Sequence, residues 1–333
     1  MLMWNSWQGT AAEWDELLAR FPDCSVYQTH GWGVHKSHFG WRPHRLVATN
    51  HGETVAMAQL LARRTRLGVA LGWMPGGPIG AINTLDTSFR KALVQAVGVP
   101  FLYCRINRMC DHSVEDETRM RSLGWQRPSH SLLSGQSVLL SLELDENEWL
   151  RSIDKKHRYY VKKSAGAGIT WAAGDTEELR RDLAQLTAQL SEEKGMALQE
   201  RSAAALEDLS REMPGAVEIL VGRLDSEAVT GCMVLKCAGK AIYATAATVG
   251  RGRETSAAYI MLAKLRGHLR EQGVKLLDFG GINPASEKAR GVDHFKRGFG
   301  GSDVRYCGEW DWATVPGLRW AANLLIKHRA GTV

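Results

Sequence analysis

Residues 44–61 (HRLVATNHGETVAMAQLL) and residues 218–235 (EILVGRLDSEAVTGCMVL) decide the fold, because they read as two copies of one unit. At an offset of 174 residues, Leu46 falls on Leu220 and the surrounding pattern repeats. Each copy has an apolar run, a short polar turn and a second apolar run, which is the pattern of a β-hairpin. The sequence therefore predicts a duplicated hairpin.

The same offset holds further along the chain. The helix candidate that begins at Ser88 falls on one that begins at Leu262, and the next apolar strand from Pro100 falls on one from Gly273. Hairpin strands, then a helix, then a strand is the order of the GNAT acyltransferase fold, whose central sheet splays open to admit an activated acyl group. We therefore predict an α/β (α+β) chain with two tandem GNAT-like domains, whose mixed, mainly antiparallel sheets are flanked by helices.

Helices are expected between the two copies. Residues 145–168 begin with acidic residues and end at glycine, 175–196 carry leucines at helical spacing, and 202–215 have Ser202 as a possible N-cap. We place the domain boundary near residue 145, which gives a first domain over 1–145 and a second over 146–333.

The second domain is predicted to include an amphipathic C-terminal helix. Its apolar side is expected to pack on the body of the protein, with a membrane surface as the alternative. That side consists of Leu318, Trp320, Ala321, Leu324 and Leu325.

The composition is that of an ordinary soluble protein, with 44% hydrophobic and 23% charged residues. A net charge of +6 favours anionic partners such as nucleotide sugars, RNA or anionic lipid. None of the six cysteines forms a CxxC pair, so we expect buried free thiols, a reducing compartment and no metal. The N-terminal residues lack the basic stretch followed by an apolar stretch that is typical of a secretory leader, and no apolar run is long enough to span a bilayer. We therefore expect a cytoplasmic protein, with the inner face of the membrane as an alternative location.

The pyrophosphate loop of GNAT enzymes that use coenzyme A, Q/R-x-x-G-x-G/A before a helix, has no match. Residues 248–261 (TVGRGRETSAAYIM) contain Gly250 and Gly252, but no glycine pair stands at the required spacing. The most specific signal for acetyl-CoA is therefore missing, although its use is not excluded.

Residues 276–312 (LLDFGGINPASEKARGVDHFKRGFGGSDVRYCGEWDW) resemble the C-terminal signature of the Fem family of peptidyltransferases, D-F-G-G-I followed by G-[LV]-x-x-F-K-x-G-F-G. Residues 153–169 look like the family's basic helix, residues 25–41 like its N-terminal Q-x-x-x-W-x-x-x-K segment, and residues 74–80 like its P-x-G-P strand end. These motifs occur in the family's order and span most of the chain.

The resemblance implies two GNAT-like domains and transfer of an amino acid from aminoacyl-tRNA to an amine of a UDP- or lipid-linked muropeptide or related acceptor. The helices within 175–213 look too short for the long arm of some members, so the chain resembles the compact ones. No cofactor is expected besides the co-substrate, which is aminoacyl-tRNA or, alternatively, acyl-CoA. Contact with a membrane surface is a further expectation, and no DNA partner is expected.

Lys296 is the principal catalytic candidate, because a fixed cation would stabilise the negative charge that develops on the carbonyl and ribose oxygens during aminolysis. Residues 291–301 are predicted to form a glycine-rich loop that presents it, with Phe295 beside it as a pin. Asp278 at a strand end could orient the amine or accept a proton, or it could simply hold the adjacent turn. His294 is a further candidate base.

The resemblance also implies an acceptor site in which cations contact a diphosphate and aromatic or glycine positions line the groove. For the tyrosines, a half-buried structural role is the alternative. The predicted substrate-binding residues are Lys36, Trp32, Arg158, Tyr159, Tyr160, Tyr243, Gly280, Gly281 and Gly298.

Three functions remain open from the sequence. The first is transfer from aminoacyl-tRNA, which the missing pyrophosphate loop favours. The second is N-acylation of a sugar or peptide from acyl-CoA or an acyl carrier, in polysaccharide or peptide natural-product synthesis. The third is a non-catalytic protein that binds envelope precursors.

Overall fold

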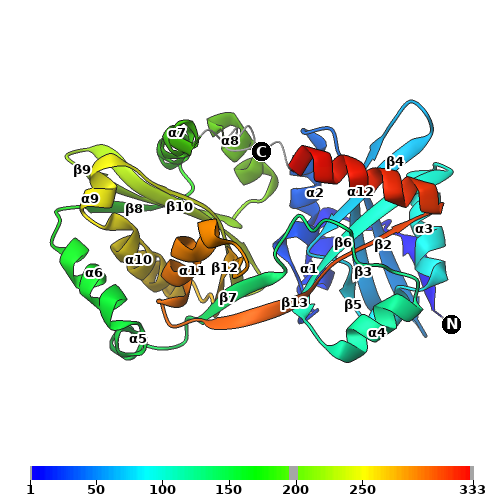
Figure 1. Ribbon diagram of the computed structural model, residues 1–333, viewed down its shortest axis with the longest axis horizontal. Coiled ribbons are helices and arrows are strands. Elements are labelled where there is room, and N and C mark those ends of the chain that lie inside the picture. The colour runs from blue at the N-terminus through cyan, green and yellow to red at the C-terminus, as the bar shows by residue number, and fades with distance from the viewer. Residues whose placement is uncertain (1, 195–201, 331–333) are drawn as a thin grey trace. The chain divides into compact units, whose positions relative to one another are not determined.

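The structure is a computed structural model that describes residues 2–194 and 202–330. The chain forms two compact units (Figure 1). Unit 1 holds the residues up to Gly135 together with those from Arg305 onward, and unit 2 holds Gln136–Val304.

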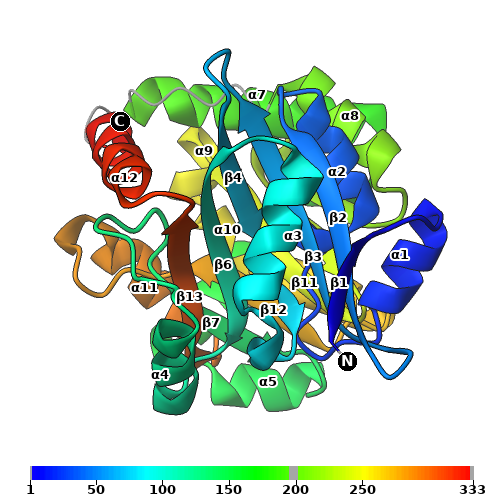
Figure 2. The same cartoon turned by 90° about the vertical axis from the view of Figure 1, so that its right-hand side faces the viewer.

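Unit 1 is built on a sheet whose helices lie on both of its faces. Helix α3 (Thr87–Val97) crosses one face (Figure 2), while α1 (Ala11–Leu18) and α2 (His30–Ser37) lie on the other; α4 (Val114–Ser122) and α12 (Pro316–Ala330) complete the unit. Phe89 and Leu93 of α3 are fully buried against the strands. The strands follow the order β1 (Met3–Ser6), β2 (Arg42–Asn50), β3 (Glu53–Arg64), β4 (Val69–Pro75), β6 (Phe101–Asp111) and β13 (Ser302–Ala313), with β5 (Ile79–Gly80) on β3.

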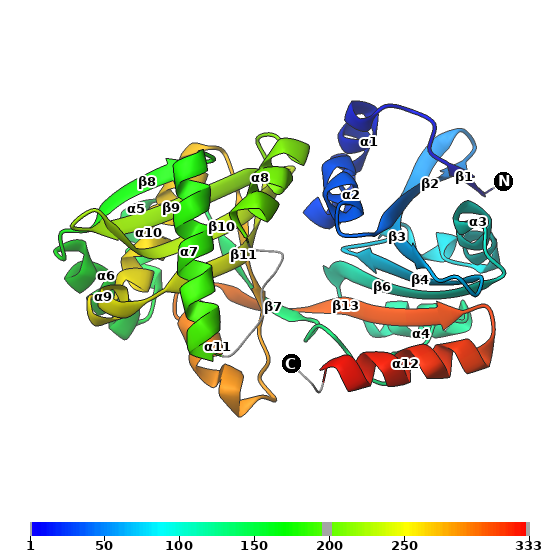
Figure 3. The same ribbon diagram turned by 90° about the horizontal axis from the view of Figure 1, so that it is seen from above.

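Unit 2 repeats this plan. Its strands follow the order β8 (Thr170–Gly174), β9 (Val217–Leu224), β10 (Glu227–Cys237), β11 (Lys240–Thr248), β12 (Leu276–Gly281) and β7 (Gln136–Ser141). Helix α7 (Glu177–Lys194) lies across one face (Figure 3), and α10 (Ala257–Glu271) buries Leu265 and Leu269 on the other. The remaining helices are α5 (Glu146–Ser152), α6 (Lys155–Ala165), α8 (Ala203–Glu212), α9 (Gly250–Glu254) and α11 (Arg290–Arg297).

The two hairpins confirm the sequence repeat down to single residues. The turn between β2 and β3 holds His51 and Gly52 at φ of 51° and 88°, and the turn between β9 and β10 holds Asp225 and Ser226 at φ of 50° and 70°. These pairs are 174 residues apart. Two successive residues at positive φ suit the right-handed twist of a tight hairpin, so both copies form the same kind of turn. The parallel pairs β4–β6 and β11–β12 are also equivalent, and the other described strand pairs are antiparallel.

The division of the chain differs from the predicted boundary at residue 145. Strand β7 lies in unit 2, where it pairs with β12, and β13 pairs with β6 in unit 1, so both β13 and α12 belong to unit 1. Each of these two strands follows the helix of one unit and completes the sheet of the other. The predicted boundary fails because the two units exchange strands: β7 joins the sheet of unit 2, and β13 joins the sheet of unit 1. A comparison of repeats along the chain does not reveal this exchange.

The helices between the copies form largely as expected. The predicted helix over 145–168 is two helices, α5 and α6, separated at Ile153 and Asp154. Ser202 caps α8 as predicted, with its hydroxyl accepting from the Ala205 amide at 3.2 Å.

The predicted loop over 291–301 is wrong for its first part. Residues up to Arg297 form α11, and the chain turns at Gly298 and Gly300 before β13 begins. Lys296 therefore lies in the last turn of a helix.

Helix α12 is turned differently from the prediction. Trp320, Leu324 and Leu325 are 70%, 52% and 62% exposed, while Asn323 is buried. Asn323 donates to Asp311 at 2.6 Å and accepts from Arg105 at 3.1 Å, so polar contacts anchor the helix while these three large apolar residues face outward. Within the described residues, every helix falls short of the length and apolarity that a bilayer crossing requires.

Candidate active site

The central strands of unit 2 separate partway along their length. Parallel pairing of β11 with β12 covers the three positions Lys240–Ile242 opposite Leu276–Asp278. Both strands then run on, β11 to Thr248 and β12 to Gly281, beyond this ladder. In unit 1 the equivalent strands β4 and β6 pair over seven positions. The opening that a GNAT fold uses to admit an acyl group is therefore expected in unit 2.

Lys296 lies where β12 ends (Figure 1 shows α11 near this strand). Its Nζ donates to the carbonyl oxygens of Gly280 at 3.2 Å and Gly281 at 2.7 Å. Burial lowers the pKa of Lys296 from its ordinary value, whereas the carboxylates of Asp293 and Asp278 act in the opposite direction. The arrangement holds a partly desolvated ammonium group at the end of the open strand.

Asp278 holds the turn that Lys296 contacts. This residue is buried, and its carboxylate accepts from the Gly280 amide at 2.8 Å and from the Ser137 hydroxyl. Ser137 also lies 2.8 Å from the Gly280 carbonyl oxygen, and its one proton can serve either acceptor. Of the two roles considered for Asp278, the turn-holding one thus has direct geometric support.

Gly280 needs the backbone freedom of glycine at this turn. Its φ is +74°, and an added Cβ would lie 3.4 Å from the Tyr243 carbonyl oxygen. The turn therefore joins the end of β12 to the neighbouring strand β11 at the point where their ladder stops.

Sequence reasoning missed Asp293. It is buried on α11, three residues before Lys296, and accepts from the Asn283 amide at 3.0 Å. Three residues of separation place two side chains on one helical face. The signal was present as the spacing D-x-x-K, but it has meaning only once the segment is known to be a helix.

Phe295 does not act as the predicted pin. Adjacent helical positions point in different directions, and the Phe295 ring packs edge-on against Tyr259 and Phe299, with centroids 5.1 and 5.0 Å away. Phe299 is fully buried in the core of unit 2. These ring contacts attach α11 to the core of unit 2 and so fix the position of the helix that carries Lys296.

Gly298 has a packing role. A Cβ on this residue would lie 2.0 to 2.3 Å from the ring atoms of His157. The carbonyl oxygen of Gly298 accepts a hydrogen bond from the Asp154 amide at 3.0 Å. Glycine at this position lets the start of α6 approach the end of α11. We find here a structural reason for the glycine that the sequence analysis assigned to substrate binding.

Helix α6, which carries His157, also carries three of the predicted substrate-binding residues. Arg158 donates to the Leu150 carbonyl oxygen at 3.1 Å and so joins α6 to the end of α5. Tyr160 stacks on Tyr259 at 4.8 Å, while Tyr159 is 59% exposed. The tyrosines thus extend from the aromatic cluster toward solvent.

Tyr243 lies on β11 and meets Phe279 edge-on at 6.1 Å. Burial raises the pKa of Tyr243 well above its ordinary value, so its hydroxyl is neutral. It lies on β11 directly after the last residue of the β11–β12 ladder, Ile242, and packs against the core of unit 2.

Trp32 and Lys36 form a separate cluster in unit 1, on α2. Both are buried, and the Lys36 amine lies 4.6 Å from the centroid of the Trp32 ring and 5.6 Å from that of Phe39. A cation over an aromatic face is favourable, most of all when it is desolvated. The Trp32 indole nitrogen is buried without a hydrogen-bond partner in the structure.

The connection from β11 to α10 shows what stands in the position of a pyrophosphate loop. Helix α9 occupies it, and an added Cβ on Gly252 would lie 2.3 Å from the Val229 carbonyl oxygen, so this glycine serves packing on β10. The amides of Gly252, Thr255 and Ser256 donate to carbonyl oxygens within the same connection. Donors used in this way cannot cradle a pyrophosphate.

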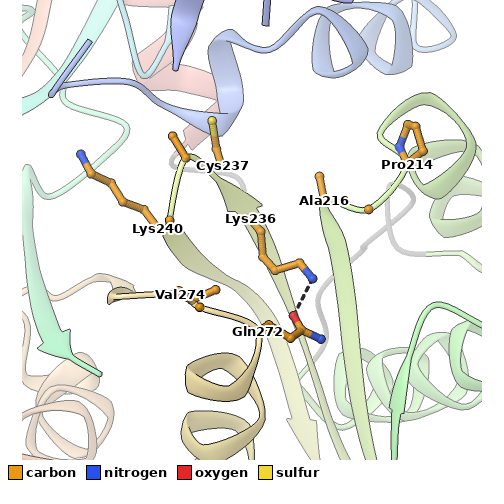
Figure 4. Close-up of a pocket in the computed structure, with 11 residues that line it drawn as sticks. Pro214, Ala216, Lys236, Cys237, Lys240, Gln272 and Val274 are labelled. Carbon is orange, nitrogen blue, oxygen red and sulfur yellow. Dashed lines mark hydrogen bonds between the residues drawn. The ribbon is translucent and has the colours of Figure 1, made fainter. Parts of the chain in front are cut away.

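A hollow of about 680 Å³ lies beside the first residues of β9 and β11 and the last residues of β10 (Figure 4). Lys236 reaches across it and donates to Gln272 at 2.7 Å and to Glu218 at 2.8 Å. The residues that line this hollow include none of the predicted site residues, so it stands apart from the turn at Gly280.

Comparison with known proteins agrees with this architecture. A family model described as an acetyltransferase (GNAT) domain matches residues 150–297. The crystal structure of FemX superposes with a TM-score of 0.80 over 92% of this chain and 96% of that one, at 16% identity. The chain has the tandem GNAT fold of FemX. Searching curated protein sequences gives no match.

Two further structures share the fold at larger distance. A tandem GNAT protein from the clavulanic acid biosynthesis pathway has a TM-score of 0.57 at 14% identity and covers 95% of this chain and 99% of its own. The C-terminal domain of a protein assigned as a lysylphosphatidylglycerol synthetase, from Agrobacterium fabrum, has a TM-score of 0.55 at 12% identity, with coverages of 94% and 96%. At these identities the likeness establishes the fold.

Proposed function

We propose that the chain is an aminoacyltransferase, which moves an amino acid from aminoacyl-tRNA to an amine of a peptidoglycan precursor or a related peptide. The observation that carries this proposal is the ammonium group of Lys296, held by the Gly280 and Gly281 carbonyl oxygens where β12 leaves β11. The tandem fold shared with FemX and the Fem-like motifs support the same assignment.

The reaction is an aminolysis. The acceptor amine attacks the ester carbonyl carbon, a C–N bond forms, the C–O bond to the ribose breaks, and a proton passes from the nitrogen to the departing ribose oxygen. Lys296 would stabilise negative charge on the carbonyl oxygen or on the ribose oxygen. Its lowered pKa suits a group that also gives a proton to that leaving oxygen.

The acceptor would be held by cations and aromatic rings. Lys36 over Trp32 is the phosphate contact proposed for unit 1, and the α6 region around Arg158 is, independently of it, the phosphate contact proposed for unit 2. Four exposed lysines on α6 would meet tRNA or acceptor phosphates, and they are Lys155, Lys156, Lys162 and Lys163.

Transfer from acyl-CoA is the second candidate, since the GNAT model matches unit 2 and a tandem GNAT protein shares the fold. Against it stands the β11–α10 connection, in which the amides of Gly252, Thr255 and Ser256 are already bonded internally. A non-catalytic precursor-binding protein is the third candidate, and it gives Lys296 no role in chemistry.

The test is an incubation of the protein with a UDP-linked muropeptide and either a mixture of aminoacyl-tRNAs or acetyl-CoA, followed by mass spectrometry of the acceptor. We expect the acceptor to gain the mass of one amino acid residue with tRNA only. Acetylation would support the second candidate instead. Acceptor binding without any product would support the third.

We also propose that α12 rests on an anionic membrane surface. Trp320, Leu324 and Leu325 are exposed along it, Lys327 lies beside them, and the chain carries a net charge of +6. Sedimentation with phosphatidylglycerol vesicles should fall for the double variant Trp320→Ser, Leu325→Ser. Unchanged sedimentation, or a dimer that the same variant disrupts, would contradict this contact.

A further inference from the structure

Three potential metal ligands meet where the start of α6 contacts the end of α11. Asp154, His157 and His294 each offer one ligand atom, and these atoms all lie within 4.8 Å of one another. They come from segments 137 positions apart in sequence, since Asp154 and His157 bracket the first turn of α6 and His294 stands on α11. The cysteine and histidine spacing of the sequence gave no sign of this cluster.

His157 is already oriented as a metal ligand would be. Its side chain is fully buried, and Nε2 lies 3.0 Å from the Phe295 carbonyl oxygen. Because a carbonyl oxygen can only accept, Nε2 carries the hydrogen and Nδ1 carries a lone pair. Metal-binding histidines characteristically donate their other ring N–H to a carbonyl or carboxylate, which fixes the ring and its tautomer.

The Nδ1 atom of His157 has no hydrogen-bond partner although it is buried. Buried polar atoms without a partner are uncommon and call for an explanation. A Cβ on Gly298 would collide with this ring, so glycine at that position makes room for an imidazole in this orientation.

Asp154 leaves its carboxylate available. It is the N-cap residue of α6, where an aspartate side chain usually accepts from the backbone of the first turn, yet here the side chain makes no capping hydrogen bond. The Asp154 amide instead donates to the Gly298 carbonyl oxygen, which ties the residue to the end of α11.

We propose that Asp154, His157 and His294 bind a divalent transition-metal ion of the zinc class, with water as a fourth ligand. Two imidazole nitrogens and one carboxylate oxygen are a donor set that Zn²⁺ accepts. Ligand atoms around a tetrahedral zinc lie roughly 3.3 Å apart, so the site closes by small rotations of the two exposed side chains, Asp154 and His294. The ion joins α6 to α11, the helix that carries Lys296.

Binding is measured on the full chain after dialysis against a chelator, by calorimetric titration with Zn²⁺ and by the visible absorption of Co²⁺. No substrate is present, so the result is independent of the proposed aminoacyl transfer. We expect one ion per chain, a four-coordinate Co²⁺ spectrum and a higher melting temperature with Zn²⁺. Replacing His157 risks unfolding, so the test uses the exposed ligands, through His294→Ala and Asp154→Asn.

Each of these variants should weaken Zn²⁺ binding by about tenfold or more and abolish the rise in melting temperature. His51→Asn is the matched control, because His51 is exposed in a hairpin of unit 1 at φ 51°, a conformation that asparagine tolerates. It should bind Zn²⁺ as the wild type does. Equal affinity in all four proteins, or no binding in the wild type, would overturn the proposal.

Discussion

The two units share one topology but differ at their centre. In unit 1 the parallel strands β4 and β6 are paired along seven positions, whereas in unit 2 the equivalent strands β11 and β12 separate after three. The offset of 174 residues places Ser122 and Cys104 of unit 1 at the positions of Lys296 and Asp278. Unit 2 thus combines the open strands with a lysine and an aspartate at the strand end. In unit 1 the strands stay paired, and the two equivalent positions hold uncharged residues.

Unit 1 carries its buried charges elsewhere. Asp311 is fully buried and accepts from Arg319 and Asn323, both at 2.6 Å, and from Tyr103 at 3.1 Å. This network fastens α12 to the sheet. In unit 1 the buried charges thus serve the attachment of a helix, whereas in unit 2 they lie at the end of the open strand.

The largest expected effect separates Lys296 from its counterpart. Lys296→Met should lower the transfer rate by about 100-fold or more, since it removes the cation that faces developing charge. Ser122→Ala, which alters an exposed residue bonded to the Arg119 carbonyl oxygen, should leave the rate unchanged. Initial rates with aminoacyl-tRNA and muropeptide measure both. Equal rates in the two variants would contradict a catalytic role for Lys296 that its counterpart in unit 1 lacks.

Asp311→Ala tests the structural role of unit 1. The change leaves the charge of Arg319 without its buried partner and leaves Arg105 with Glu309 as its remaining carboxylate, so the free energy of unfolding should fall by about 3–5 kcal/mol. Asp303→Ala breaks the exposed pair with Arg297 in unit 2 and should cost at most about 1 kcal/mol. Urea denaturation of the two variants should therefore give clearly different midpoints. Similar midpoints would show that the buried network of Asp311 contributes no more to the free energy of unfolding than the exposed Asp303–Arg297 pair does.

Gly298→Ala tests the attachment of α11. The new methyl group would meet the fixed ring of His157, so the free energy of unfolding should fall by about 1–3 kcal/mol. Gly291→Ala on the same helix meets nothing within 4 Å and should raise stability by about 0.5–1 kcal/mol. Thermal unfolding measures both, and a stabilising Gly298→Ala would contradict the described contact.

The smallest effect concerns pH. The native pKa of Lys296 is lowered by burial, while in the unfolded chain it lies near the ordinary value of about 10.4. Between the two values the unfolded state binds more protons, so the free energy of unfolding rises with pH across this window. Compared with Lys296→Met, the wild type should gain stability between neutral and strongly alkaline pH. Parallel stability curves for the two proteins would show that the lysine is not perturbed.

The sequence predicted the fold well, because a hairpin repeat is encoded locally. The turns at 51–52 and 225–226 and the cap at Ser202 rest on residues next to each other in the chain. The exchange of β7 and β13 was not predictable in this way, since a repeat shows which segments are alike but not which sheet edge each segment joins.

The candidate site was predicted unevenly for a related reason. Lys296 and Asp278, both chosen from the sequence as catalytic candidates, do meet at one turn. Phe295 and Gly298 proved to be packing residues, and Asp293 was missed, because their roles depend on α11 being a helix packed on His157. The apolar face of α12 was misplaced because the buried partner of that helix, Asp311, is polar.

The exchanged strand β13 also bears on how the protein is made. Its residues from Arg305 to Ala313 are synthesised after the whole of unit 2, yet they complete the sheet that begins with β1. During translation unit 2 can therefore finish first, while unit 1 keeps the edge of β6 unpaired until almost the entire chain has left the ribosome. An exposed strand edge favours aggregation, so a chain truncated before residue 305 should be prone to it even though most of unit 1 is present.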